Sequence, residues 1–213
     1  MKTIEEKVKG KEHAIAYTHV ETESNAVCFM FAGIGYTYDR PLLYYATMMM
    51  LQHEIDVVQV HYHYGRKMLK QPFDARVKIM MDDIQPVIDA VLADHPYTRF
   101  VFLGKSIGTI PIAGELIRRK AWLNATFLLL TPLLTHDRLF THLLNAEHPG
   151  LLVIGDHDRF YDVERVSRLK ETQWNVCVIP GADHSLNIGF DTDASLSALA
   201  NVMKSIEHVI NQG

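Results

Sequence analysis

The sequence is poor in cysteine, in long apolar runs and in excess positive charge, and each of these lacks argues against a class of protein. Its 213 residues include only two cysteines, Cys28 and Cys177, each inside an apolar run typical of a strand. Small secreted domains stapled by disulfides carry many more. We therefore expect two buried free thiols and a fold that depends on its apolar core.

No apolar run approaches the roughly 20 residues that are needed to span a bilayer. The first eleven residues are charged and lack the apolar centre of a signal peptide. The formal net charge of −4 argues against a nucleic-acid or anionic-membrane binder, because such proteins usually carry basic patches. These features predict a soluble, cytoplasmic protein without nucleic-acid or membrane partners, and they leave its oligomeric state open.

Apolar segments typical of strands alternate with helical patterns from Ala26 to the end of the chain. The runs Ala26 to Ala32, Phe100 to Leu103 and Leu151 to Ile154 are continuous, as in strands that are covered on both faces. Strands that alternate with helices indicate a parallel sheet with right-handed crossovers. We expect one α/β domain over residues 1–213, a three-layer, doubly wound and mostly parallel sheet of about seven or eight strands with helices on both faces.

The sequence Gly104-Lys105-Ser106-Ile107-Gly108 stands between a predicted strand and a predicted helix. In that context a G-x-S-x-G motif forms a sharp, strained turn that lifts the serine hydroxyl above the sheet edge. The turn also aims the Ile107 N–H at the space where an oxyanion would form. The motif is common by chance, so its weight depends on whether an acid and a histidine follow in order.

An aspartate and a histidine do follow, each just beyond the carboxyl end of a later strand. Asp158 lies in Gly155-Asp156-His157-Asp158, and His184 ends the run Gly181-Ala182-Asp183-His184. Open α/β sheets place their ligands at this edge. Serine needs a base within hydrogen-bond reach, histidine has a suitable pKa, and aspartate fixes its tautomer. Asp156 and Asp137 remain alternative acids.

The oxyanion hole needs a second backbone donor, and the turn after the first buried strand offers one. In Ala32-Gly33-Ile34-Gly35 the glycines allow the backbone to approach a ligand closely. We expect the N–H of Ile34 to act together with that of Ile107. The neighbouring loops are expected to line the substrate pocket, through Gly33, Gly35, Tyr36, Tyr62 and Phe160.

These motifs resemble those of the α/β-hydrolase superfamily, in particular a small serine hydrolase or esterase without a cap domain. The resemblance covers Ala26 to Ile210. It implies that Ser106 is the nucleophile, Asp158 the acid and His184 the base. In one respect the sequence departs from the family, which often has His-Gly before the oxyanion residue where this chain has Ala32-Gly33.

The connection from Thr131 to His148 is too short for a large lid, so we expect an open pocket roofed by loops. The predicted function is acyl transfer from a small carboxylic ester to water. Thioesterase, lactonase and peptidase activity remain alternatives, as does a non-catalytic binding protein of the same fold. The intact set of three residues favours the enzyme.

No cofactor is expected. The phosphate-binding frame G-x-x-x-x-G-K-[ST] is absent, and Lys105 is expected to point away from the pocket. His61 and His63 alternate along a predicted strand in a way that could suit a metal, yet no further ligands join them at a recognisable spacing. The sequence therefore predicts no metal site.

Overall fold

The computed structural model describes residues 1–212, apart from the side chain of Arg66. Eight strands form one sheet in the order β1-β2-β4-β3-β5-β6-β7-β8. The strands are β1 (Lys2–Lys9), β2 (Ala14–Glu21), β3 (Ala26–Phe31), β4 (Asp56–His61), β5 (Arg99–Lys105), β6 (Thr126–Leu130), β7 (Gly150–Gly155) and β8 (Trp174–Ile179). Strands β3 to β8 run parallel, whereas β2 is antiparallel to both β1 and β4.

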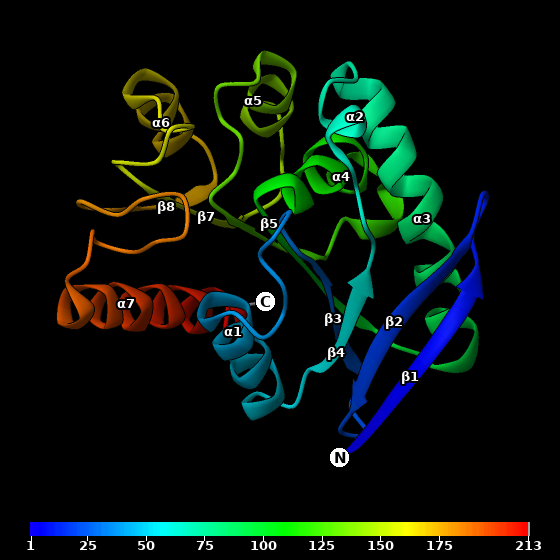
Figure 1. Cartoon of the computed structure of the whole chain (residues 1–213). Coiled ribbons are helices and arrows are strands. Elements are labelled where there is room, and N and C mark those ends of the chain that lie inside the picture. The colour runs from blue at the N-terminus through cyan, green and yellow to red at the C-terminus, as the bar shows by residue number, and fades with distance from the viewer. Residues whose placement is uncertain (213) are drawn as a thin grey trace.

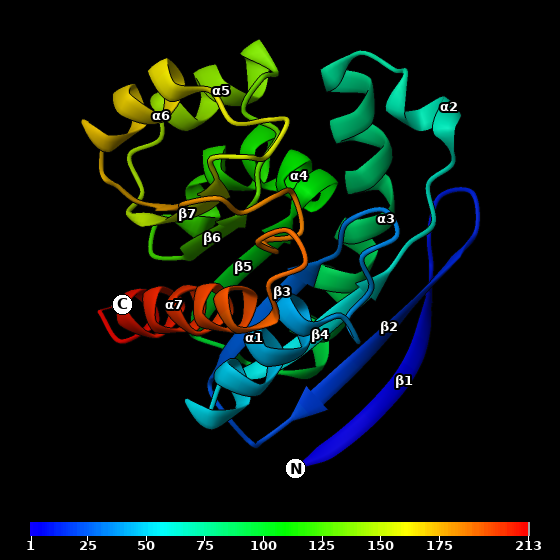
Figure 2. The same cartoon turned by 60° about the vertical axis from the view of Figure 1, so that its left-hand side comes forward.

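The helices cover both faces of this sheet (Figures 1 and 2). They are α1 (Pro41–Gln52), α2 (Arg66–Leu69), α3 (Phe73–Asp94), α4 (Thr109–Gly114), α5 (Asp137–Leu144), α6 (Val163–Lys170) and α7 (Thr192–Ile210). The buried side chains of α1 and α7 form a core on one face, and those of α3 to α6 form a core on the other. The predicted three-layer fold with a mostly parallel sheet is confirmed.

The interior strands are mostly apolar because both of their faces are covered. All six residues of β3 and all five of β6 are buried. The outermost strand, β1, is charged and largely exposed, which disfavours its pairing with a strand of another chain. The polarity of each strand thus follows its place in the sheet.

No lid is inserted between β6 and β7. Residues 131–149 contain the eight-residue helix α5 and short connecting segments. Within residues 1–212, none of the helices is both long and apolar enough to cross a membrane. The carboxyl ends of the parallel strands are bordered by loops and by the helices α2 and α3.

Candidate active site

Ser106 occupies a sharp turn between β5 and α4. Its φ of 56° lies in the left-handed region, which costs a residue with a side chain on the order of 1–2 kcal/mol. The flanking glycines permit the turn because the backbone packs tightly around them. A Cβ on Gly104 would lie 2.4 Å from the backbone oxygen of Gly108, and one on Gly108 would lie 2.0 Å from that of Phe31. The strained elbow predicted from the sequence is present.

The structure brings Ser106, His184 and Asp158 into one hydrogen-bonded row. His184 Nε2 lies 2.8 Å from Ser106 Oγ, and His184 Nδ1 lies 2.7 Å from Asp158 Oδ2. The side chain of Asp158 is fully buried, and its other oxygen accepts a hydrogen bond of 2.9 Å from the Phe160 N–H. A carboxylate held at both oxygens fixes the orientation and tautomer of the imidazole.

The loops that carry Asp158 and His184 are packed against each other. A Cβ on Gly155 would lie 2.0 Å from the backbone oxygen of Ala182, so only glycine fits there. Asp156 Oδ1 accepts a hydrogen bond of 2.6 Å from the Gly181 N–H. Asp156 therefore joins the loop that carries His184 to the loop that carries Asp158, while Asp158 itself contacts the imidazole.

Asp137, the other alternative acid, lies away from this row. It begins α5, its side chain is 85% exposed, and it pairs with Arg165 on α6. Of the three candidate carboxylates, Asp158 is the one that the fold brings to His184.

Ile34 and Ile107 both line a cavity of about 400 Å³ that contains Ser106 and His184. The turn that carries Ile34 lies against the elbow, since a Cβ on Gly33 would come within 3.3 Å of Ser106 Cβ. Both expected oxyanion donors thus belong to residues at the same cavity as the serine.

The cavity wall combines aromatic, aliphatic and basic side chains. It is lined by Ile34, Gly35, Tyr36, Leu69, Arg76, Lys105, Ser106, Ile107, Leu133, His136, Arg159, Phe160, His184 and Ser185. The Phe160 ring packs edge-on against the His184 ring, with centroids 5.1 Å apart. Gly35, Tyr36 and Phe160 therefore line the same cavity as Ser106.

The structure places two other expected pocket residues, Gly33 and Tyr62, at a neighbouring hollow of about 320 Å³. The Tyr62 hydroxyl donates a 2.7 Å hydrogen bond to the backbone oxygen of Ala32, and its ring stacks on Tyr64 at a centroid distance of 4.7 Å. These contacts draw the ring to the other side of the glycine turn, away from Ser106.

Lys105 lines the cavity, although its side chain was expected to point away from the pocket. It is 2% exposed, its Nζ donates a 2.9 Å hydrogen bond to the backbone oxygen of His184, and it lies 4.6 Å from the centre of the Tyr36 ring. Burial lowers its pKa to about 8, and the Asp158 carboxylate opposes that shift. The buried Lys105 cation therefore binds the backbone of the loop that carries His184.

Arg76 is a second basic residue that the sequence analysis missed. It lies in α3, is 6% exposed, and its Nε has no hydrogen-bond partner among the described residues. Burial lowers its pKa, yet a guanidinium stays charged at neutral pH. The available signal was its position between Phe73 and Val77, because an arginine on the apolar face of a helix needs a reason to be there.

Comparison with known proteins supports the fold on which this site stands. Residues 25–211 match a family model described as an alpha/beta hydrolase domain. The chain belongs to the α/β-hydrolase superfamily. No curated protein matches it in sequence.

Among solved structures, this α/β hydrolase is similar to the esterase Pf2001 of Pyrococcus furiosus, with 11% identity, a TM-score of 0.75, and coverage of 99% of this chain and 92% of the other. A putative α/β hydrolase of unknown function from Agrobacterium tumefaciens gives 18% identity, a TM-score of 0.73, and coverage of 98% and 95%. XC6422 from Xanthomonas campestris, described as a serine hydrolase without lid, gives 16% identity, a TM-score of 0.70, and coverage of 100% and 95%. At such identities the likeness concerns the fold.

Proposed function

We propose that this α/β hydrolase is a serine hydrolase that transfers the acyl group of a small carboxylic ester to water. The observation that carries the proposal is the continuous contact from Ser106 Oγ through both ring nitrogens of His184 to the buried Asp158 carboxylate. A serine on a strained elbow, in contact with an oriented imidazole, has the arrangement that nucleophilic catalysis needs.

In the proposed reaction Ser106 Oγ attacks the ester carbonyl while His184 Nε2 takes the hydroxyl proton. The imidazolium then gives this proton to the leaving alkoxide, and an acyl-serine remains. A water molecule attacks the acyl carbon, His184 accepts its proton, and the Ser106 oxygen leaves with that proton as the acid departs. Asp158 stays ionised and stabilises the imidazolium in both steps.

The N–H groups of Ile34 and Ile107 would stabilise the oxyanion of each tetrahedral intermediate. Two features support this role: both residues line the cavity of Ser106, and the Ile107 N–H lies in the short helical segment Ser106–Gly108 that begins at the serine. One donor to an oxyanion is worth about 10²–10³-fold in kcat in a comparable enzyme.

The missing lid supports a preference for short acyl chains. Each methylene that the protein encloses contributes about 0.8 kcal/mol to binding, and methylenes beyond the rim stay in water. We expect kcat/KM for p-nitrophenyl esters to peak at about two to six acyl carbons. A rate that keeps climbing with long-chain esters would show instead that residues 62–72, including α2, cover an extended channel.

The basic residues in the cavity wall support a preference for substrates whose acyl group carries a negative charge. Arg76, Arg159 and His136 line the same cavity as Ser106, and Arg76 is buried with an unpaired Nε. A carboxylate on the substrate would supply the missing hydrogen-bond acceptor, and charge-assisted hydrogen bonds are among the stronger ones in proteins.

This preference can be measured with a pair of esters, p-nitrophenyl butyrate and the p-nitrophenyl half-ester of succinic acid. We expect wild type to favour the half-ester in kcat/KM, and Arg76→Met to lose that advantage by about tenfold or more, since a hydrogen bond to a charged group is worth ~1.5–3 kcal/mol. Arg138→Gln, an exposed arginine on α5, is the matched control. Equal losses for both esters would refute an anion-binding role.

The nucleophile is tested by labelling with a fluorophosphonate, followed by intact-mass analysis and peptide mapping. We expect one adduct, on Ser106. Adduct on another serine would refute the assignment, and no adduct together with no hydrolysis would favour a non-catalytic binding protein. Matched oxygen esters, thioesters, lactones and anilides then separate the esterase from its three alternatives.

A further inference from the structure

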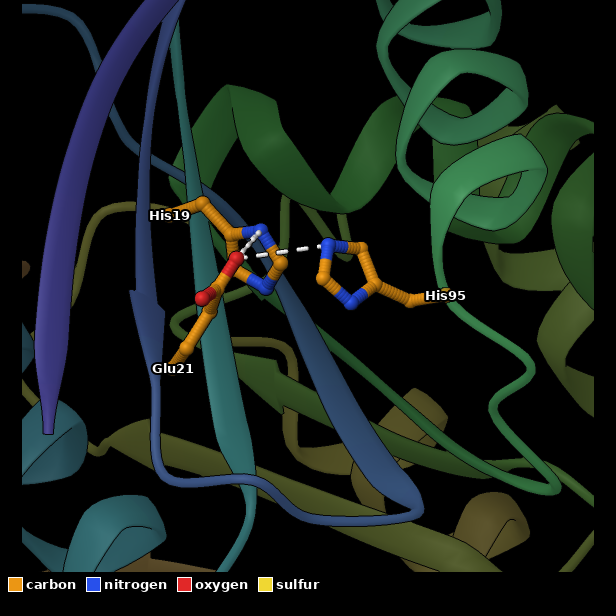
Figure 3. Close-up of side chains that lie close together, drawn as sticks. All are labelled: His19, Glu21 and His95. Atoms are coloured by element: carbon orange, nitrogen blue, oxygen red, sulfur yellow. Dashed lines mark ion pairs between the residues drawn. The ribbon is translucent and has the colours of Figure 1, made fainter.

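A second group of histidine and carboxylate side chains lies at the opposite edge of the sheet from Ser106. His19 and Glu21 are two residues apart on β2 and so share one face of the strand, and His95 follows directly after α3. This edge is where β4 begins, whereas Ser106 follows the end of β5. Figure 3 shows one carboxylate oxygen of Glu21 joined by dashed lines to a nitrogen of each imidazole ring.

The three side chains already have spacings suited to a metal ion. Glu21 Oε1 lies 3.5 Å from His19 Nδ1 and 3.3 Å from His95 Nε2, and all three atoms lie within 4.8 Å of one another. A tetrahedral centre with bonds of about 2.05 Å holds its ligand atoms about 3.3 Å apart. Two of the three separations fit this value, and binding would require the partly exposed His95 side chain to move toward His19 to close the third.

The other nitrogen of His19 is held by a hydrogen-bonded chain. Tyr97 Oη lies 2.9 Å from His19 Nε2 and 2.5 Å from Asp56 Oδ2. The other Asp56 oxygen accepts hydrogen bonds of 2.7 Å from both the N–H and the hydroxyl of Thr22. Metal-binding histidines are commonly oriented by such outer partners, and loss of these partners weakens metal binding.

This chain fixes where the proton of His19 resides. A carboxylate only accepts hydrogen bonds, so the Tyr97 hydroxyl gives its proton to Asp56 and accepts one from His19 Nε2. The lone pair of neutral His19 is then on Nδ1, which faces the Glu21 carboxylate. Two acceptors 3.5 Å apart in a largely buried place repel each other unless a proton or a metal ion lies between them.

We propose that His19 Nδ1, His95 Nε2 and a carboxylate oxygen of Glu21 bind one zinc ion. Two imidazoles and one carboxylate are a known ligand set for zinc, and water occupies the fourth position on the solvent side. The ion neutralises the carboxylate and joins β2 to the segment between α3 and β5. It lies at the sheet edge away from Ser106, so its effect is on stability and it takes no part in ester hydrolysis.

The test starts with the full chain stripped by a chelator and dialysed into metal-free buffer. Zinc alone is titrated by calorimetry, and the melting temperature is followed at each zinc concentration. We expect one tight site per chain and a melting temperature that rises with zinc, because zinc binds the folded state. Cobalt in place of zinc should give the visible absorption bands of a four-coordinate ion.

Glu21→Gln and His95→Gln should each weaken zinc binding at least tenfold and remove the thermal shift, with unchanged ester hydrolysis. The control His208→Gln changes an exposed histidine on α7 and should leave both intact. Binding that survives in both site variants would place the zinc on other histidines and overturn the proposal. Failure of wild type to bind zinc would overturn it as well, and the Glu21–His95 contact would then be an ordinary ion pair.

Discussion

The carboxyl ends of the parallel strands form one edge of the sheet, and their amino ends form the opposite edge. Each edge holds a histidine between a hydroxyl and a carboxylate, yet the two arrangements differ in where the hydroxyl proton goes. At the carboxyl edge, the Asp158 carboxylate accepts from the Nδ1–H of His184, so Nε2 is left to accept from the Ser106 hydroxyl. At the amino edge, Tyr97 gives its proton to Asp56, so the Nε2 of His19 donates.

This reversal changes what each histidine can do. The proton of Ser106 is available to its imidazole, which makes His184 suitable as a base. The proton of Tyr97 is already committed, which leaves a bare nitrogen beside Glu21 and makes His19 suitable as a metal ligand. The residue types in the two groups are nearly the same, and a single carboxylate, Asp56, makes the difference.

The largest effect is expected when the hydrogen-bonded row of Ser106, His184 and Asp158 loses its serine hydroxyl. Ser106→Ala should lower kcat by about 10⁶-fold, as loss of the nucleophile does in a serine protease. Steady-state ester hydrolysis measures this, and Ser185→Ala, in the same cavity wall, is the control. A variant that retains more than a small fraction of activity would show that another residue is the nucleophile.

The next effect separates the two neighbouring aspartates. Asp158→Asn should lower kcat by about 10⁴-fold, because an amide favours the wrong histidine tautomer. Asp156→Asn should cost much less, since its oxygen holds only the Gly181 N–H. Rates of the two variants at saturating ester decide the matter. Equal losses, or the reverse order, would contradict the role of Asp158.

A third prediction concerns the buried lysine beneath His184. The pKa of Lys105 falls from 10.5 to about 8 on folding, so between these pH values the unfolded chain binds more protons than the folded one. The free energy of unfolding should therefore rise with pH across this window, by about 3 kcal/mol at ~1.4 kcal/mol per pH unit. Below pH 8 this gain is absent.

Urea unfolding of wild type and Lys105→Met at several pH values measures this gain, because the methionine variant lacks it. When the free energy of unfolding is plotted against pH for both proteins, the difference between the two curves cancels the titration of the other groups. Parallel curves would mean that Lys105 keeps an ordinary pKa in the folded chain.

The smallest expected effect concerns the amino edge without metal. In the zinc-free chain above neutral pH, Glu21→Gln should leave the stability unchanged or raise it by about 1 kcal/mol, since the amide can donate to His19 Nδ1. Thermal melts in chelator measure it. With zinc present the order should reverse. A clear loss of stability in chelator would show that Glu21 stabilises the fold without an ion.

Local sequence was enough to predict the buried strands, because runs covered on both faces are unmistakably apolar. It predicted less well where the backbone is irregular. The helix expected after Ser106 is only the six residues of α4, which ends at Gly114, where the backbone packs against the Val77 side chain. Helix α3 continues through Pro86, although a proline inside a helix usually kinks or breaks it.

The order of Ser106, Asp158 and His184 along the chain was informative because parallel strands end at one edge. The sequence by itself thus determined the sheet, the elbow and the residues that meet there. Only the tertiary structure decided the environments of Lys105, Arg76 and His19, because their partners come from segments far apart in the chain. No spacing pattern links His19 to His95 or Tyr97, so the hydrogen bonds that fix the proton on His19 exist only once β2, β4 and β5 have assembled.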